Sequence, residues 1–129
     1  DALLQLWTVE RDDVAPLFFD EEWLQWRLQL HPDLVVPILI VHSKSANWMV
    51  RRKAVSMLGK LQSSHATVVP TLVARLKDER AIVRAESADA LAMFGTAASE
   101  AETALRIAEN DHYLTVRVAA EDALIAIHK

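Results

Sequence analysis

Three arginines recur in this chain at a fixed distance, and their side chains are suited to a specific charged contact. Arg51, Arg84 and Arg117 follow one another at intervals of 33 residues. Asp78 and Asp111 lie six residues before the second and the third of these arginines. A guanidinium group can hold a carboxylate through two parallel hydrogen bonds. We therefore expect a structural row of arginine–aspartate contacts, in which each arginine reaches either the carboxylate of its own loop or that of the adjacent unit.

No catalytic or metal-binding constellation accompanies this row. The chain has no cysteine, which excludes thiolate chemistry and cysteine-ligated zinc. The histidines form no closed ligand set with one another or with carboxylates at helical spacing: His31, His42, His65, His112 and His128. No Gly-x-Ser-x-Gly elbow and no glycine-rich phosphate loop occurs, although the sequence leaves a Ser-His-Asp triad open. We expect no catalytic residue, no metal and no cofactor.

The elements that must position the arginines follow the same period. Apolar positions repeat with it, as in Val50, Val83 and Val116, and again in Leu58, Leu91 and Leu124. A fixed period of this length indicates a solenoid, in which each unit buries its apolar face against its neighbours. In the second unit we expect a first helix over 67–77, with Pro70 in its first turn. A second helix follows over 79–94, with Asp78 between the two as an N-cap or a loop ligand.

The repeated pattern resembles the short bacterial type of HEAT repeat. It consists of Val-Arg, small residues and then Ala-Leu or Met-Leu, with an aspartate six residues before the arginine, and the resemblance covers about residues 33–129. It implies an all-α, right-handed α–α superhelix with units at 33–66, 67–99 and 100–129. It also implies that the aspartates and arginines form a ladder joining successive repeats, which Ser45 interrupts in the first copy.

The same resemblance implies that the second helices line a concave face. The residues on that face not needed for the core are Arg52, Lys53, Ser56 and Lys60 in the first unit, Glu86, Asp89 and Met93 in the second, and Asp122 in the third. The face therefore changes from basic to acidic along the stack. A groove polarised in this way would orient a partner of complementary charge. Alternatively, Lys53 and Glu86 pair across repeats in solvent; pairing and binding are compatible, and both interpretations stay open.

Residues 1–32 do not fit the period, and we interpret them as a divergent helical cap. They hold Trp7, Trp23 and Trp26 together with two of the three phenylalanines. These aromatic residues are better explained by closing the end of the core than by a peptide-binding patch, because aromatic side chains contribute most of their energy through burial.

Composition narrows the choice of partners. The formal charge of −4 and the pI near 5.7 argue against nucleic acid and anionic membranes, which require a basic face. The most apolar run, residues 34–41, is too short to span a bilayer. The lack of disulfides fits a reducing compartment, so we expect the cytoplasm. The sequence also suggests a piece of a longer chain.

These observations favour a non-catalytic scaffold that binds another protein, or a domain of the same parent chain, on the concave face. The resemblance also extends to HEAT-type phycobilin lyases, so the alternative is a component of such a lyase or of a related tetrapyrrole-handling factor. No motif in the sequence selects that activity.

Overall fold

The computed structural model describes residues 32–129, and this part of the chain consists of helices joined by short loops. The expected cap and its tryptophans therefore lie outside the described residues, apart from residue 32. The helices are α4 (Pro32–His42), α5 (Trp48–Leu61), α6 (His65–Arg75), α7 (Ala81–Phe94), the 3₁₀ helix η1 (Gly95–Ala101), α8 (Glu102–Ala108) and α9 (Leu114–Ile127). No strand occurs in residues 32–129, and the all-α fold class is confirmed.

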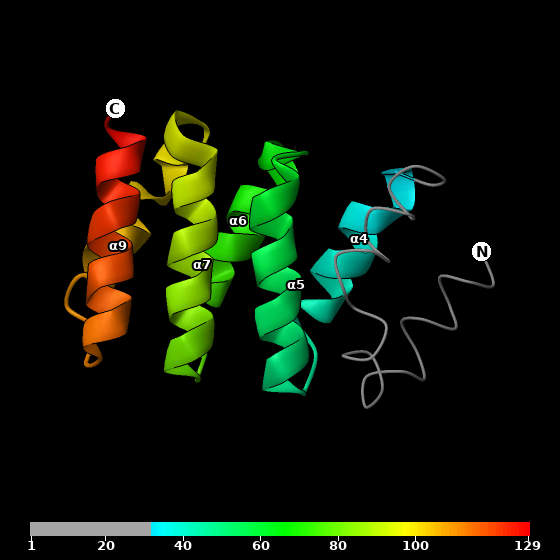
Figure 1. Cartoon of the computed structure of the whole chain (residues 1–129), viewed down its shortest axis with the longest axis horizontal. Coiled ribbons are helices and arrows are strands. Elements are labelled where there is room, and N and C mark those ends of the chain that lie inside the picture. The colour runs from blue at the N-terminus through cyan, green and yellow to red at the C-terminus, as the bar shows by residue number, and fades with distance from the viewer. Residues whose placement is uncertain (1–31) are drawn as a thin grey trace.

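The helices form two layers. Helices α5, α7 and α9 stand side by side and run in the same direction, while α6 and the η1–α8 segment pack behind them (Figure 1). Helix α4 packs against α5 at the other end of the stack. Helices α5, α7 and α9 are the second helices of the three units, and α7 contacts both α5 and α9. Side chains at equivalent positions of successive units therefore lie next to one another along this layer.

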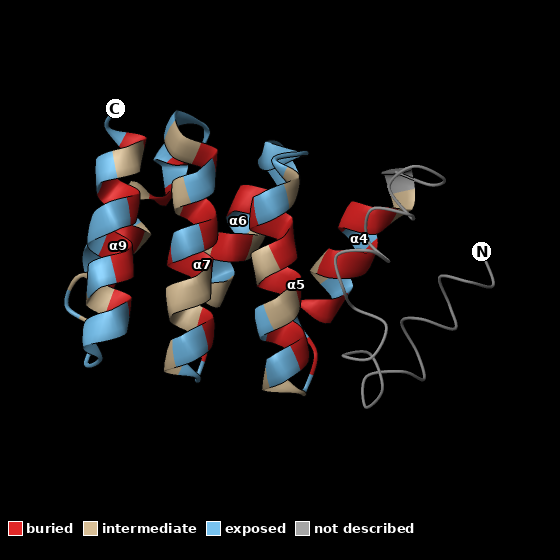
Figure 2. Cartoon of the chain, in the orientation of Figure 1, coloured by how far each residue is buried: buried red, intermediate tan, exposed pale blue. Residues whose placement is uncertain are grey.

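The core lies between the two layers and repeats with the period of the sequence. Val50, Val83 and Val116 are completely buried, and the leucines eight residues after each of them are also buried. In Figure 2 the buried positions form stripes on the sides of α5, α7 and α9 that face neighbouring helices. These apolar residues, which repeat every 33 positions in the sequence, are therefore the ones that the fold buries.

Helices α5 and α7 approach most closely at Gly59. A β carbon built on this glycine would lie 2.7 Å from the β carbon of Ala90 and 2.8 Å from its α carbon. Real β carbons do not come so near to backbone atoms, so the side chain at this position must be hydrogen for the two helices to keep their spacing.

Two details differ from the sequence-based expectations. Helix α6 begins at His65, two residues before the expected unit boundary, because the amides of Thr67 and Val68 already donate to the carbonyl of Ser64. Pro70 therefore lies inside the helix and not in its first turn.

The third unit also departs from a simple hairpin. Gly95 ends α7 with a φ of 55°, a backbone conformation that favours glycine. The chain then forms η1 before the seven-residue α8. The expected boundary between residues 99 and 100 thus falls within the 3₁₀ helix.

Candidate functional site: a row of ion pairs and a polarised helical face

The first contact of the row joins α5 to the loop that precedes α7. Arg51 donates from Nε and Nη2 to the two carboxylate oxygens of Asp78, at 2.8 and 3.0 Å. Only 7% of the arginine side chain and 2% of the aspartate side chain are exposed. The remaining Nη1 donates to the carbonyls of Ser45 and Ala46 in the arginine's own loop, at 2.9 and 3.2 Å. One guanidinium group therefore holds two successive loops.

The second contact repeats this geometry one unit later. Arg84 on α7 donates to the carboxylate of Asp111 from Nε at 2.8 Å and from Nη2 at 3.1 Å. Its Nη1 donates to the carbonyl of Asp78 at 2.8 Å. Both arginines thus bind the aspartate of the following unit, 27 residues later, and contact the backbone of their own loop. The sequence left open whether each arginine binds the carboxylate of its own loop or that of the adjacent unit. In the structure, Arg51 and Arg84 both bind the carboxylate of the adjacent unit.

A short turn fixes each aspartate in place. The amide of Arg80 donates to Asp78 Oδ1 at 2.9 Å, and the amide of Tyr113 donates to Asp111 Oδ1 at 3.0 Å. Arg80 and Tyr113 are the N-cap residues of α7 and α9, so the aspartates are loop ligands and not N-caps. In the first unit Ser45 Oγ accepts the equivalent bond from the Asn47 amide at 3.1 Å. The serine thus keeps the turn without supplying a carboxylate.

The charged contacts shift the pKa values of these carboxyl groups. Burial acts to raise the pKa of Asp78, but the hydrogen bonds from Arg51 and from the Arg80 amide hold it below its ordinary value. The hydrogen bond from Arg84 lowers the pKa of Asp111, against a smaller opposing effect of burial. Both aspartates are therefore ionised at neutral pH, as the paired geometry requires.

Arg117 occupies the third position of the row. Its Nη1 donates to the carbonyls of Asp111 and His112 at 2.8 and 3.1 Å, as the earlier arginines do in their own loops. No carboxylate within residues 32–129 binds it. The structure thus brings together two arginine–aspartate pairs and leaves the third arginine with backbone partners.

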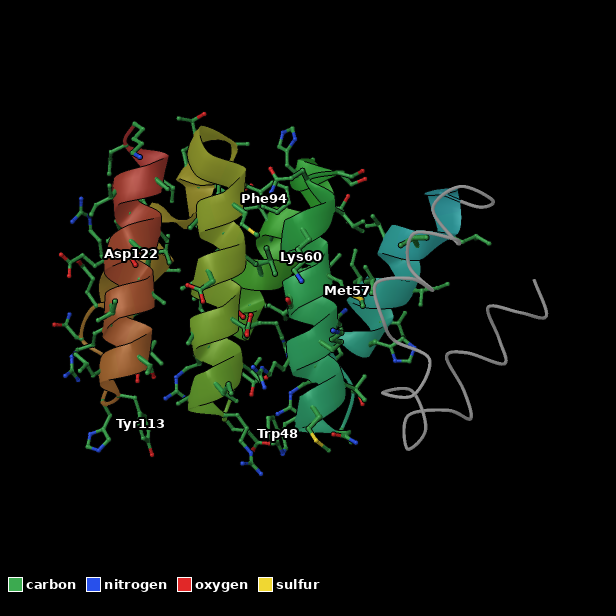
Figure 3. The ribbon with its side chains drawn as sticks, in the orientation of Figure 1. Trp48, Met57, Lys60, Phe94, Tyr113 and Asp122 are labelled. Atoms are coloured by element: carbon green, nitrogen blue, oxygen red, sulfur yellow. The ribbon has the colours of Figure 1, made fainter. Side chains whose placement is uncertain are left out.

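Two aromatic rings beside the row were missed by the sequence analysis. The guanidinium carbon of Arg80 lies 4.8 Å from the ring centroid of Trp48, and that of Arg84 lies 5.9 Å from the ring of Tyr113. Figure 3 shows Trp48 and Tyr113 at the same edge of the layer. The available signal was the position of each aromatic residue where a helix begins: Trp48 is the first residue of α5, and Tyr113 is the N-cap residue of α9. Both contacts have the geometry of cation–π interactions.

The second candidate surface is the outer face of α5, α7 and α9, which we call the second-helix face. It carries Arg52, Lys53, Ser56 and Lys60 on α5, Glu86, Asp89 and Met93 on α7, and Asp122 on α9. None of these side chains is buried. In Figure 3 Lys60 and Asp122 both lie on the face turned toward the viewer. The structure therefore places the eight residues on one solvent-accessible layer.

An ion pair crosses this face, but with a different basic partner from the one considered. Arg52 Nε lies 3.4 Å from Glu86 Oε1. The sequence analysis considered a pair between Lys53 and Glu86 as one of two open interpretations; in the structure the adjacent Arg52 forms the pair with Glu86. Arg52 and Glu86 line an open hollow of about 340 Å³ together with Met49, Lys53 and Ser56. Basic, acidic and apolar groups thus meet in one depression.

On the acidic half of the second-helix face, the pKa of one carboxyl group is raised. Partial burial of the carboxyl group raises the pKa of Asp89, and the nearby charges of Glu86 and Asp122 raise it further. Carboxylates on α7 and α9 are therefore close enough to repel one another. A cationic group placed against them would relieve that repulsion.

Neither metal chemistry nor a membrane span is indicated for the described part of the chain. Residues 32–129 contain no group of three or more histidine or carboxylate side chains placed to hold a metal ion. His42 is buried at the end of α4, and the other described histidines are exposed. None of the described helices is long and apolar enough to cross a bilayer.

The stacked hairpins, the shared second-helix layer and the pairs that join successive units define an α-solenoid. A family model described as HEAT repeats matches residues 35–125. The chain belongs to the HEAT-repeat family. A search of curated proteins finds no match to it.

Proposed function

We propose that this chain is a non-catalytic scaffold that binds a partner protein, or a neighbouring domain, on the second-helix face. HEAT repeats in general mediate protein–protein interactions, and solenoids offer extended surfaces for such contacts. The proposal assigns this general role to one face of this chain.

The change of charge along the face is the observation that carries the proposal. Arg52, Lys53 and Lys60 lie on α5, whereas the carboxylates of Glu86, Asp89 and Asp122 lie on α7 and α9. Charges arranged in this way select both the partner and its orientation more than they add affinity. The fitting partner presents acidic groups to α5 and basic groups to α7 and α9.

Apolar side chains among these charges support a binding role. Met49 and Met93 are each 51% exposed, and Val118 is 47% exposed. Methionine adapts its shape to different surfaces and often occurs where proteins bind partners. Apolar contacts at the centre of a charged rim are the usual anatomy of a protein interface.

The ion pair on the face does not prevent binding. Arg52 is 47% exposed and its contact with Glu86 is long, and exposed pairs of this kind contribute about 0–1 kcal/mol. A partner carboxylate can therefore replace Glu86 at little cost.

The test is a comparative capture from lysate of the native host, with the captured proteins identified by mass spectrometry. The face variant is Arg52→Glu, Lys53→Glu, Lys60→Glu. The control variant, Lys44→Glu, Lys77→Glu, Lys129→Glu, has the same change in net charge on exposed residues outside the face. Circular dichroism should first show that both variants keep the helical content of the parent.

The proposal expects one or more proteins to be captured by the parent and by the control variant but lost from the face variant. Capture of the same set by all three chains would rule out the basic end of the second-helix face as the binding surface.

A further inference from the structure

A polar hollow lies where the loop between α4 and α5 meets the loop between α6 and α7. It is open to solvent and has a volume of about 380 Å³. Four cationic side chains and two carboxylates line it, so the hollow has an excess of two positive charges. These charged residues are Lys44, Arg51, Arg75, Lys77, Asp78 and Glu79.

Only one of these cations is fully paired within the protein. Arg51 and Asp78 neutralise each other through their two hydrogen bonds. The side chain of Glu79 is 84% exposed and lies 3.6 Å from Arg51 Nη2, which is a weak contact. Lys44 and Lys77 are exposed, and neither ammonium group forms an ion pair within residues 32–129. The two lysines and the remaining arginine therefore supply positive charge that the protein itself does not balance.

The guanidinium of Arg75 is largely buried but has few partners. Its side chain is 25% exposed, and its Nη1 lies 3.8 Å from Asp78 Oδ2, a carboxylate that Arg51 already binds. Its one hydrogen bond in the described chain runs from Nη1 to the carbonyl of Ser43 and is long, at 3.5 Å. The buried Nε has no acceptor in residues 32–129. A buried donor left without a partner costs about 1–3 kcal/mol, and such a group in a folded protein calls for an explanation. An anion in the hollow, toward which this guanidinium can turn, would supply the missing acceptors.

The stacking of the units does not require these cations, because the next pair of loops lacks them. The equivalent positions there, 33 residues later, carry as many carboxylates as cations. Both pairs of loops nevertheless form the same arginine–aspartate contact. The positive excess is therefore specific to the first pair of loops and comes from three differences: Ser45 stands where the next unit has Asp78, Arg75 where it has Ala108, and Lys77 where it has Asn110.

We propose that this hollow binds a phosphate group, either as inorganic phosphate or as the phosphomonoester of a small molecule, and that Lys44, Arg75 and Lys77 hold it. The site lies outside the second-helix face, and the inference does not depend on the function proposed for that face. Lys44 and Lys77 do not belong to the second-helix face, so the control variant of the capture experiment still tests that face alone.

Charge and size both favour a phosphate group over a carboxylate. A phosphomonoester carries about −1.5 to −2 charge at neutral pH and has three strong acceptor oxygens, which matches the excess of two positive charges and the several donors. Arginine and lysine are the side chains that commonly bind phosphate groups. The volume of the hollow is within the range of small-molecule sites, so an organic group attached to the phosphate also has room.

The test titrates the full chain with inorganic phosphate, with glycerol 3-phosphate and with acetate, at neutral pH and constant ionic strength. Isothermal titration calorimetry measures the association constant, and ¹H–¹⁵N NMR locates the site. We expect saturable binding of one phosphate group per chain, with shifts of the backbone amides confined to the two loops and to Arg75, and weaker binding of acetate because it carries a single charge. Tighter binding of glycerol 3-phosphate than of inorganic phosphate would assign the site to a phosphorylated small molecule, and the reverse order would assign it to the free ion.

Variants with matched charge then test the three cations. The double variant Arg75→Ala, Lys77→Asn introduces the residues of the following unit, and we expect the association constant to fall by about tenfold or more, since hydrogen bonds to charged groups are lost. Lys44→Gln, Lys77→Gln changes exposed side chains only and should also weaken binding, so the test holds even if replacement of Arg75 unfolds the chain. The control, Arg106→Gln, Lys129→Gln, removes the same charge from exposed residues outside the hollow and should bind as the parent does. Circular dichroism should first show that each variant is folded.

Three results would overturn the proposal. The first is that neither phosphate compound binds saturably to the parent chain. The second is that the control variant loses as much affinity as the variants of the hollow, because binding would then follow net charge and not this site. The third is that acetate binds as tightly as phosphate, which would assign the hollow to a carboxylate.

Discussion

Arg84 binds the carboxylate of Asp111 and the carbonyl of Asp78, so a single side chain connects the two loop aspartates of the row. Arg51 connects Ser45 to Asp78 in the same way. Each guanidinium group thus spans two successive loops at the edge where α5, α7 and α9 begin. The spacing of units at this edge depends on charged hydrogen bonds, which are stronger than neutral ones.

Replacement of Arg84 tests how much this contact stabilises the fold. Arg84→Ala leaves the Asp111 carboxylate and the Asp78 carbonyl without their partner, and we expect a loss of about 2–3 kcal/mol in the free energy of unfolding. The measurement is urea unfolding at pH 7. The control is Arg106→Ala, since Arg106 is 59% exposed and contacts Glu102 at 3.7 Å; such surface pairs contribute less than about 1 kcal/mol. Equal stability of the parent and Arg84→Ala would show that the pair is dispensable.

The lowered pKa values of Asp78 and Asp111 predict a loss of stability in acid. Their ionised forms are bound in the folded state, so the unfolded state takes up protons first as the pH falls. Their contribution is complete above about pH 4, near the ordinary aspartate pKa, and is lost as the pH falls through the lower folded-state values. Thermal unfolding between pH 2 and 7 should show this decline. The double variant Asp78→Asn, Asp111→Asn should be less stable at pH 7 and should show a shallower decline; an unchanged slope would assign it to other carboxyl groups.

Asp89 should behave in the opposite way. Its pKa is raised by partial burial and by the charges of Glu86 and Asp122, so the ionised form is disfavoured in the folded state. Asp89→Asn should therefore increase stability slightly at pH 7, by at most about 0.5 kcal/mol as is usual for surface changes. The difference from the parent should shrink as the pH falls and Asp89 becomes protonated. The control is Glu100→Gln on η1, which removes one negative charge away from this cluster. A decrease in stability for Asp89→Asn would mean that the carboxylate makes a favourable contact.

The sequence predicts which residues form the row of ion pairs, because the arginines and the aspartates recur with the same period. The spacing alone does not decide whether an arginine binds the aspartate of its own loop or that of the adjacent unit; the packing of α5 against α7 and of α7 against α9 decides it. The partner of Glu86 is harder to predict, since Arg52 and Lys53 are adjacent and the period does not distinguish them. Similarly, Pro70 suggests a helix start because proline fits a first turn, but the left-handed Ser64 sets that start earlier. The backbone conformation of Ser64 thus decides where α6 begins.

Gly59 tests the close approach of α5 and α7. In an exposed helix, replacing glycine by alanine stabilises by about 1 kcal/mol. Here the added methyl group would meet the backbone of Ala90, and overpacking costs about 1–3 kcal/mol. We expect Gly59→Ala to lower the urea midpoint, with only partial recovery in the double variant Gly59→Ala, Ala90→Gly, because the Ala90 α carbon remains in the way. A higher midpoint for Gly59→Ala would show that the helices separate at little cost.

The absence of a carboxylate at Ser45 has a consequence for the charge of the whole row. Each later unit adds one arginine and one aspartate, while the first unit adds Arg51 alone, so the row carries one positive charge in excess, located at Arg117.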